Sequence, residues 1–143
     1  MSRWVAGCLA FALGACLTPG QQRRDSFLRV AREFNDDLRW GRYETAVGNL
    51  PPDEAQRFLE RVRLVGPDLQ LGDQEVTQIT FESDDAATVD VRFEWFSRRE
   101  MVVHNTSLRQ RWEHRGGRWL LVEQRRLGGD RFALVPERAT AAQ

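Results

Sequence analysis

Residues 88–95 read TVDVRFEW, and this stretch decides the fold class of the chain. Its apolar and polar side chains alternate without a break, with Val89, Val91, Phe93 and Trp95 set between Asp90, Arg92 and Glu94. A period of two is typical of a β-strand that buries one face and exposes the other. We therefore expect a half-buried strand here.

The sequence predicts further strands on both sides of this one. Residues 76–82 alternate in the same way, with Thr77, Ile79 and Phe81 on the apolar side, and Ser83-Asp84-Asp85 is a turn signal. A third strand covers about 101–114 and a fourth covers 118–125, joined by a two-residue turn at Gly116-Gly117. Residues 132–135 are interpreted as a short edge strand, and residues 136–143 as a disordered tail.

The first half of the chain has the period of helices instead. A first helix is expected from Asp25 or Ser26, both good N-caps, to Trp40-Gly41, and its apolar stripe is Phe27, Val30, Ala31, Phe34 and Leu38. A second begins at the proline pair 51–52 and stops at residues 66–67. Helices followed by an antiparallel sheet of about four strands indicate an α+β fold.

Charge and composition exclude several classes of function. The 143 residues carry 21 bases and 21 acids, so no basic excess supports sequence-independent binding to nucleic acid. All the bases are arginine, which excludes a Schiff-base lysine. His104 and His114 lie about 33 Å apart along an extended strand, so they cannot share a metal ion within it. We predict no metal site and no cofactor.

The N-terminus has the pattern of a secretory signal. One arginine, Arg3, precedes an unbroken apolar run at residues 4–17, which is too short to span a bilayer comfortably. The run ends in LGAC, residues 13–16, and this resembles the lipobox of bacterial lipoproteins. The resemblance implies cleavage before Cys16, diacylation of Cys16, and a residue after it that sorts the protein between membranes.

This resemblance predicts residues 1–15 as the signal peptide and residues 16–23 as the lipidated cysteine with its linker. Because Leu17 is not the aspartate that retains lipoproteins in the inner membrane, we expect an outer-membrane anchor that faces the periplasm. Residues 5–8, VAGC, also resemble a lipobox but leave too short an apolar core before Cys8. A buried N-terminal helix with two inert cysteines, or a signal cut without lipid, are the alternatives.

A second resemblance lies in the last predicted hairpin. Residues 111–124, RWEHRGGRWLLVEQ, look like the final hairpin of NTF2-like (SnoaL-like, cystatin-like) domains, and the helices before the sheet also match. The resemblance assigns residues 24–135 to one domain. It implies a curved sheet that wraps the long first helix into a cone, whose mouth often holds a ligand.

Candidate site residues follow from which side chains face the cone. The predicted inward face of the third strand carries Val102, His104, Thr106, Leu108, Gln110 and Trp112. Apolar walls with a few polar groups are what a small-molecule pocket requires. We therefore predict a ligand site formed by His104, Thr106, Gln110, Trp95 and Trp112.

Catalysis has less support. Enzymes of the NTF2-like group use an inward aspartate or histidine, commonly with a tyrosine or a second carboxylate. His104 is the one acid–base candidate here, with Tyr43 as the only tyrosine and Glu123 inward only if Trp119 and Leu121 are. Without a nucleophile or paired carboxylates this set falls short of an acid–base site, and we assign no catalytic residue.

The leading hypothesis is thus a lipid-anchored, non-catalytic domain that binds an envelope protein partner or a small apolar ligand. The alternative is an anchored enzyme of the isomerase or dehydratase type with His104 as general base. A purely structural envelope component is the third hypothesis.

Overall fold

The computed structural model describes residues 18–137. The predicted signal peptide, Cys16 and residues 138–143 lie outside this range. The elements follow one another as α1 (Pro19–Arg39), α2 (Tyr43–Ala46), η1 (Val47–Asn49), α3 (Pro52–Val65), β1 (Leu69–Ser83), β2 (Ala86–Ser97), β3 (Val103–Arg115) and β4 (Arg118–Gly129). The predicted α+β fold is confirmed.

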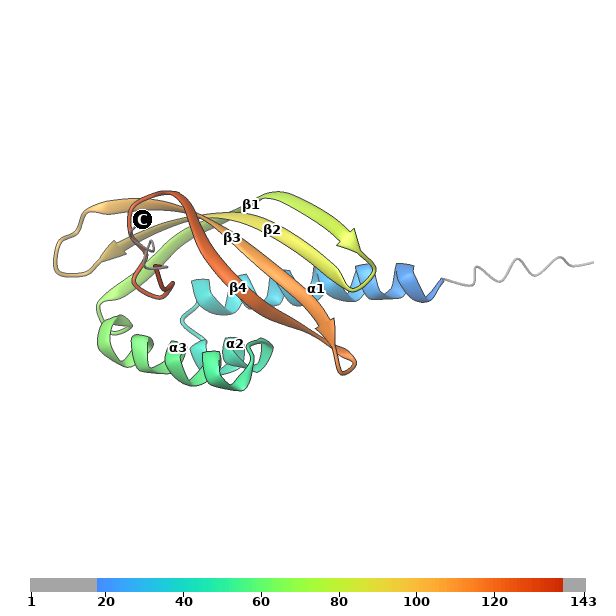
Figure 1. Cartoon of the computed structure of the whole chain (residues 1–143). Coiled ribbons are helices and arrows are strands. Elements are labelled where there is room, and N and C mark those ends of the chain that lie inside the picture. The colour runs from blue at the N-terminus through green and yellow to red at the C-terminus, as the bar shows by residue number, and fades with distance from the viewer. Residues whose placement is uncertain (1–17, 138–143) are drawn as a thin grey trace, which may run out of the picture.

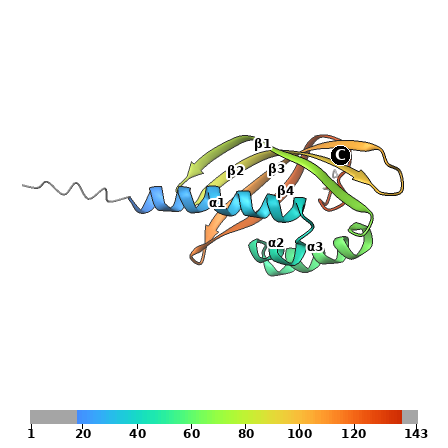
Figure 2. The same ribbon diagram turned by 180° about the vertical axis from the view of Figure 1, so that it is seen from behind.

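The four strands form one open antiparallel sheet in the order β1-β2-β3-β4. The sheet curves over the helices, and α1 runs beneath its concave face while α2 and α3 lie beyond β4 (Figures 1 and 2). No helix among the described residues is long and apolar enough to cross a membrane.

Helix α1 begins at Pro19, six residues before the predicted start at Asp25. The Thr18 side chain caps it by accepting a hydrogen bond from the Gln21 amide, and Pro19 fits the first turn, where its missing N–H is not needed. Residues 19–23 of the predicted linker are therefore helical. The predicted end is confirmed, because Trp40 is the C-cap and Gly41 follows at φ 68°.

The register of the sheet tests the prediction that Thr77, Ile79 and Phe81 of β1 share the apolar side of the strand. This strand pairs with β2 from Leu69 onward, and register shifts leave Gly72, Thr77 and Glu82 as bulges. The bulge at Thr77 turns that side chain out, where its hydroxyl donates to the Asp90 carbonyl. Ile79 and Phe81 lie opposite the buried Val89 and Ala87, so both are on the predicted face. Ile79 is nevertheless exposed on this edge strand, and Phe81 is half-buried against Phe27.

Bulges are confined to the two edge strands. On β4, register shifts leave Val122 and Leu127 without partners, whereas β2 and β3 pair without a shift from Ala86↔Glu113 to Phe96↔Val103. The central pair therefore keeps strict alternation, and the prediction that Thr106, Leu108, Gln110 and Trp112 of β3 face inward is confirmed, because all four are buried.

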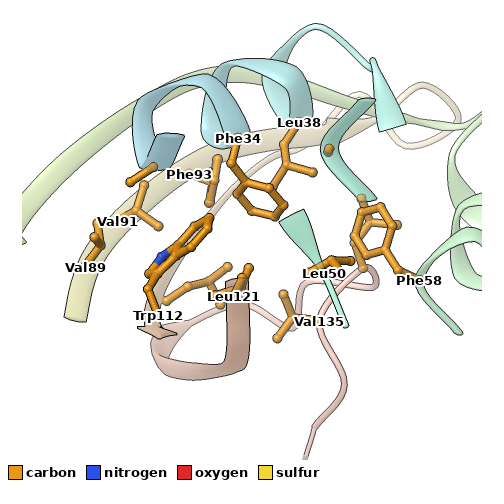
Figure 3. Packing of buried hydrophobic residues seen from close by; sticks show 14 of the residues in the cluster. Phe34, Leu38, Leu50, Phe58, Val89, Val91, Phe93, Trp112, Leu121 and Val135 are labelled. Atoms are coloured by element: carbon orange, nitrogen blue, oxygen red, sulfur yellow. The ribbon is translucent and has the colours of Figure 1, made fainter. Parts of the chain in front are cut away.

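The core lies between α1 and the concave face of the sheet. Aromatic rings fill it: Trp112 of β3 contacts Phe27 and Phe34 of α1 edge-on, at centroid distances of 6.0 and 5.4 Å. Figure 3 shows Phe34 and Leu38 reaching from α1 toward Phe93 and Trp112 of the sheet. Side chains thus fill the space between α1 and the sheet at this level.

Residues 131–137, which we call the C-terminal segment, do not form the predicted edge strand. After β4 the chain turns at Gly129, whose φ is 78°, and Phe132, Leu134 and Val135 are buried at the open end of the sheet. Figure 3 shows Val135 on the same side of the core as Leu50 and Leu121. Burial of these side chains, rather than strand pairing, determines where this segment lies.

Candidate functional site

Four side chains from three parts of the chain meet at the open end of the sheet. Trp95 of β2 and His104 of β3 are direct cross-strand partners, and their rings stack with centroids 4.4 Å apart. Thr106 lies two residues further along β3, and Asp130 follows β4. We call Trp95, His104, Thr106 and Asp130 the histidine cluster.

Hydrogen bonds fix the geometry of this cluster. The Asp130 carboxylate lies 3.1 Å from His104 Nδ1 and also accepts from the Asn105 amide at 3.3 Å. Because a carboxylate only accepts, Nδ1 carries the proton in this pair. The Trp95 indole donates to the Thr106 hydroxyl at 2.9 Å, and that hydroxyl donates to the Asp130 carbonyl at 2.8 Å.

The orientation of His104 leaves its other nitrogen toward the outside. Nε2 lies 3.7 Å from the Glu100 carboxylate, and the side chain is partly buried. A histidine held at Nδ1 by a carboxylate presents Nε2 in a defined direction, which is the arrangement an acid–base residue needs. His104 does not line the cavity of about 340 Å³ that opens beside β4.

Sequence reasoning missed Asp130. It follows Gly128-Gly129, between the predicted strands 118–125 and 132–135, and nothing in its neighbours along the chain indicates a partner on β3. The contact arises because the chain turns back at Gly129, where a Cβ would lie 2.1 Å from the Asn105 carbonyl. No side chain fits at that distance, so position 129 requires glycine. This glycine is the only local signal from which the contact of Asp130 with His104 could have been predicted.

Gln110 and Trp112, predicted as ligand-binding residues, lie deeper in the core. The Gln110 side-chain amide donates to Asn35 Oδ1 at 2.8 Å and accepts from Asn35 Nδ2 at 3.2 Å. Trp112 packs on α1, and its indole nitrogen is buried without a hydrogen-bond partner in the described part of the chain. The structure therefore brings only Trp95, His104 and Thr106 of the predicted set together.

Tyr43 and Glu123, the other catalytic candidates, do not join His104. Tyr43 lies on α2 with its ring 6.1 Å from Phe58, and burial raises the pKa of its phenol. Glu123 is the cross-strand partner of Arg111 on the convex face, because the bulge at Val122 reverses the alternation after the inward Leu121. Trp119 and Leu121 are both inward, as the condition for an inward Glu123 required, yet Glu123 itself is not.

One cavity of about 340 Å³ opens beside β4. The start of α3, residues 121–124 of β4 and the end of the C-terminal segment line it, with Leu50, Pro51, Leu121, Val122 and Pro136 as its apolar part. Asp53, Glu54 and Glu137 add carboxylates, and Arg57 adds the opposite charge. No group of three or more metal-ligating side chains occurs among residues 18–137 that could hold a metal ion.

The convex face of the sheet carries paired charges. Arg109 donates twice to Asp90, at 2.7 Å each, and these hydrogen bonds hold the pKa of Asp90 below its usual value although burial opposes them. Glu113 accepts from Arg111 Nη1 through one oxygen and from Arg115 through the other, and these hydrogen bonds, that of Arg115 first, lower the pKa of Glu113. Such alternating, neutralised charges are typical of a solvated face.

The β2–β3 connection and the first residue of β3, together residues 98–103, carry exposed apolar side chains, and we call them the hairpin tip. Met101, Val102 and Val103 are consecutive and are 74%, 52% and 57% exposed. Met101 has a φ of 54°, a left-handed backbone conformation that residues other than glycine rarely adopt. Arg98 and Arg99 precede them on the same exposed turn.

Asp68 holds the base of the hairpin tip rigidly. Its carboxylate accepts from the Ser97 hydroxyl at 2.6 Å and from the Arg99 amide at 3.2 Å, while its carbonyl accepts from the Arg98 amide at 2.8 Å. Because Asp68 leads from α3 into β1, these bonds tie the tip to both layers of the fold. The apolar residues are thus presented on a defined scaffold.

Comparisons with known proteins do not assign a class to this arrangement: no protein-family model matches the chain, and no curated protein matches it.

Proposed function

We propose that this chain is a bacterial lipoprotein, anchored in the outer membrane through Cys16, whose NTF2-like domain binds a protein partner in the periplasm. The partner site is the hairpin tip. The α+β fold with its curved sheet is compatible with the NTF2-like resemblance, and the domain carries no assigned catalytic residue.

The observation that carries the proposal is the exposed apolar run at residues 101–103. Exposed apolar side chains that adjoin one another and are rimmed by charge mark interaction sites more often than scattered ones do. The strained φ of Met101 supports this interpretation, because strained backbone persists only where the surrounding structure imposes it and concentrates at functional positions.

The position of the hairpin tip fits an anchored protein. Arg23 and Arg24, near the start of α1, pair with Asp85 and Asp84 in the β1–β2 turn, so α1 starts at the end of β2 opposite the hairpin tip. The 12 residues of β2 span about 40 Å. Cys16 precedes Pro19 by three residues, a reach of at most about 10 Å. The tip therefore points away from the anchored end (Figure 1).

A small apolar ligand has less support than a protein partner. The rings of Phe27, Phe34 and Trp112 fill the interior of the cone, and the buried Gln110–Asn35 pair already satisfies its polar groups. A ligand in the cone would have to displace these contacts.

One observation favours the enzymatic alternative, an isomerase or dehydratase with His104 as general base. The Asp130 carboxylate holds His104 Nδ1 as it would in a catalytic pair. A folded His104→Ala variant separates the two functions: we expect it to keep partner binding, whereas an enzyme would lose its activity with binding intact.

The proposal is tested with a photo-crosslinking residue placed at Met101 in the full chain inside cells. We expect a discrete cross-linked protein that disappears when Val103→Asp is added and persists with Val76→Asp. Val76 is the matched control, since it is also a strand valine and is 44% exposed, but on β1. The purified partner must then bind wild-type protein and fail to bind Val103→Asp.

The proposal is wrong if the same species forms equally with Val103→Asp, or if the tip cross-links to no protein. Cross-linking to lipid alone would instead make the hairpin tip a membrane contact. Circular dichroism of both aspartate variants establishes that loss of binding is not loss of fold.

A further inference from the structure

The C-terminal segment occupies its place through three buried side chains. Phe132, Leu134 and Val135 are buried, whereas Arg131 and Ala133 are exposed. The Phe132 ring stacks on Phe93 at a centroid distance of 5.8 Å and lies 5.7 Å from Trp95. The Val135 amide donates to the Phe132 carbonyl at 3.0 Å, so the segment makes a tight turn that directs these side chains into the core.

The backbone of the segment is held much more loosely than the sheet. In the part of the chain that the structure describes, two hydrogen bonds involve the backbone of residues 131–137: the Val135 amide donates to the Phe132 carbonyl, and Arg61 donates to the Leu134 carbonyl. Segments with few backbone hydrogen bonds open before the strands do. The segment thus resembles a bound peptide more than a fifth strand.

Both ends of the segment have defined attachments. Before it, Asp130 is fixed by His104, Asn105 and Thr106, so a pivot lies directly after Asp130. At its far end, Glu137 pairs with Arg126 at 2.9 Å. Release of residues 131–137 requires this ion pair to break. The release leaves the sheet paired up to Gly129.

The open cavity adjoins this position. Pro136 and Glu137 form one wall of the space of about 340 Å³, and Leu50, Pro51 and Leu121 form its apolar part. An incoming chain can therefore enter beside the segment before the segment has left. The apolar surface it meets continues under Val135, which lies by Leu50 and Leu121 (Figure 3).

We infer that the place held by residues 131–137 is a peptide-binding groove, which the chain's own C-terminal segment fills and from which a partner's peptide displaces it. The present occupant defines the ligand: a peptide that turns directly after an aromatic residue, with aliphatic residues two and three positions later and a carboxylate that reaches Arg126. This groove is distinct from the hairpin tip and does not rest on the proposed function.

Thiol labelling of the full chain tests the inference. In a background with Cys8→Ser and Cys16→Ser, Leu134→Cys reports release of the segment, and Val89→Cys, at an equally buried position of β2, reports global unfolding. We expect Leu134→Cys to be labelled at least about tenfold faster, because partial opening costs less than unfolding. Val135→Cys serves as a second reporter if Leu134→Cys does not fold.

The ligand probe is a synthetic peptide of residues 130–137, DRFALVPE. When it binds the groove it keeps the segment out, so millimolar peptide should raise the labelling rate at position 134 and leave position 89 unchanged. A peptide with alanine for the phenylalanine and the leucine should have no effect, whereas one with serine for the alanine should act like the parent. Equal labelling rates at both positions, or no response to the parent peptide, would overturn the inference.

Discussion

Gln110 of β3 and Asn35 of α1 exchange two amide hydrogen bonds inside the core, although 75 positions separate them in the sequence. Both side chains are buried, and each has one further contact: Asn35 Nδ2 donates to the Ala31 carbonyl at 2.9 Å, and Gln110 Nε2 donates to Gln124 at 3.4 Å. The pair fixes how α1 lies against the sheet, because any sliding of the helix would break both hydrogen bonds between the two amides in an apolar interior.

This pair predicts a strong coupling in unfolding experiments. Replacement of Asn35 by leucine removes both of its hydrogen bonds to Gln110, which keeps only the 3.4 Å contact to Gln124, and should cost about 1–3 kcal/mol of unfolding free energy. The double variant Asn35→Leu with Gln110→Met removes both polar groups and should recover much of that loss. Urea unfolding of the wild type, both single variants and the double variant measures the coupling, and additive losses would contradict it.

A pH dependence follows from Asp90. Hydrogen bonds from Arg109 lower its pKa in the folded protein, so the stabilisation is present above the pKa of an unfolded aspartate, about 3.9, and is lost as the pH falls through the lower folded value. We expect the melting temperature to fall less steeply below pH 4 in Asp90→Asn than in the wild type. Glu33→Gln, which alters an exposed pair on α1, is the control and should keep the wild-type slope.

Met101 should separate stability from function. A side chain in the left-handed region costs roughly 1–2 kcal/mol, and glycine removes that cost while it adds about 0.5–1 kcal/mol of chain entropy. Met101→Gly is therefore expected to melt at or slightly above the wild-type temperature and yet to bind the partner less. A melting temperature several degrees below the wild type would show that Met101 contributes to the fold instead.

Cys16 decides the location of the protein. We expect the chain purified from membranes to have the mass of residues 16–143 with acyl groups, and Cys16→Ser to lack that modification. Intact mass spectrometry of both proteins measures this, with Cys8→Ser as the control that should be processed normally. An uncleaved, unmodified wild-type chain would refute the anchor and with it the predicted outer-membrane location.

The central strands were predicted well from the sequence because one factor, the burial of one face, determines their alternation. Val89, Val91 and Phe93 alternate strictly, since β2 has neighbours on both sides and no bulge. At the edges, bulges at Thr77 and Val122 shift the period, and period alone cannot locate them. That is why Thr77 was placed on the wrong face, and why the inward Trp119 and Leu121 could not be used to place Glu123.

Three of the four residues of the histidine cluster could be predicted from the sequence, and Asp130 could not, for a related reason. His104, Thr106 and Trp95 could be placed together because β2 and β3 are consecutive and alternate regularly. Asp130 comes from a segment whose path depends on where Phe132 and Leu134 are buried, and this burial depends on the completed sheet. The contact between Asp130 and His104 exists only after the core has formed, so no pattern of neighbouring residues in the sequence predicts it.

The distribution of bulges also has a consequence for how these molecules behave toward one another. An open sheet has two rows of unpaired backbone groups that another strand can extend, and a long flat edge invites such growth. Here β1 is interrupted at Gly72, Thr77 and Glu82, and β4 at Val122 and Leu127, so neither edge offers an uninterrupted template. Copies crowded at high density on a surface would be kept from polymerising edge to edge.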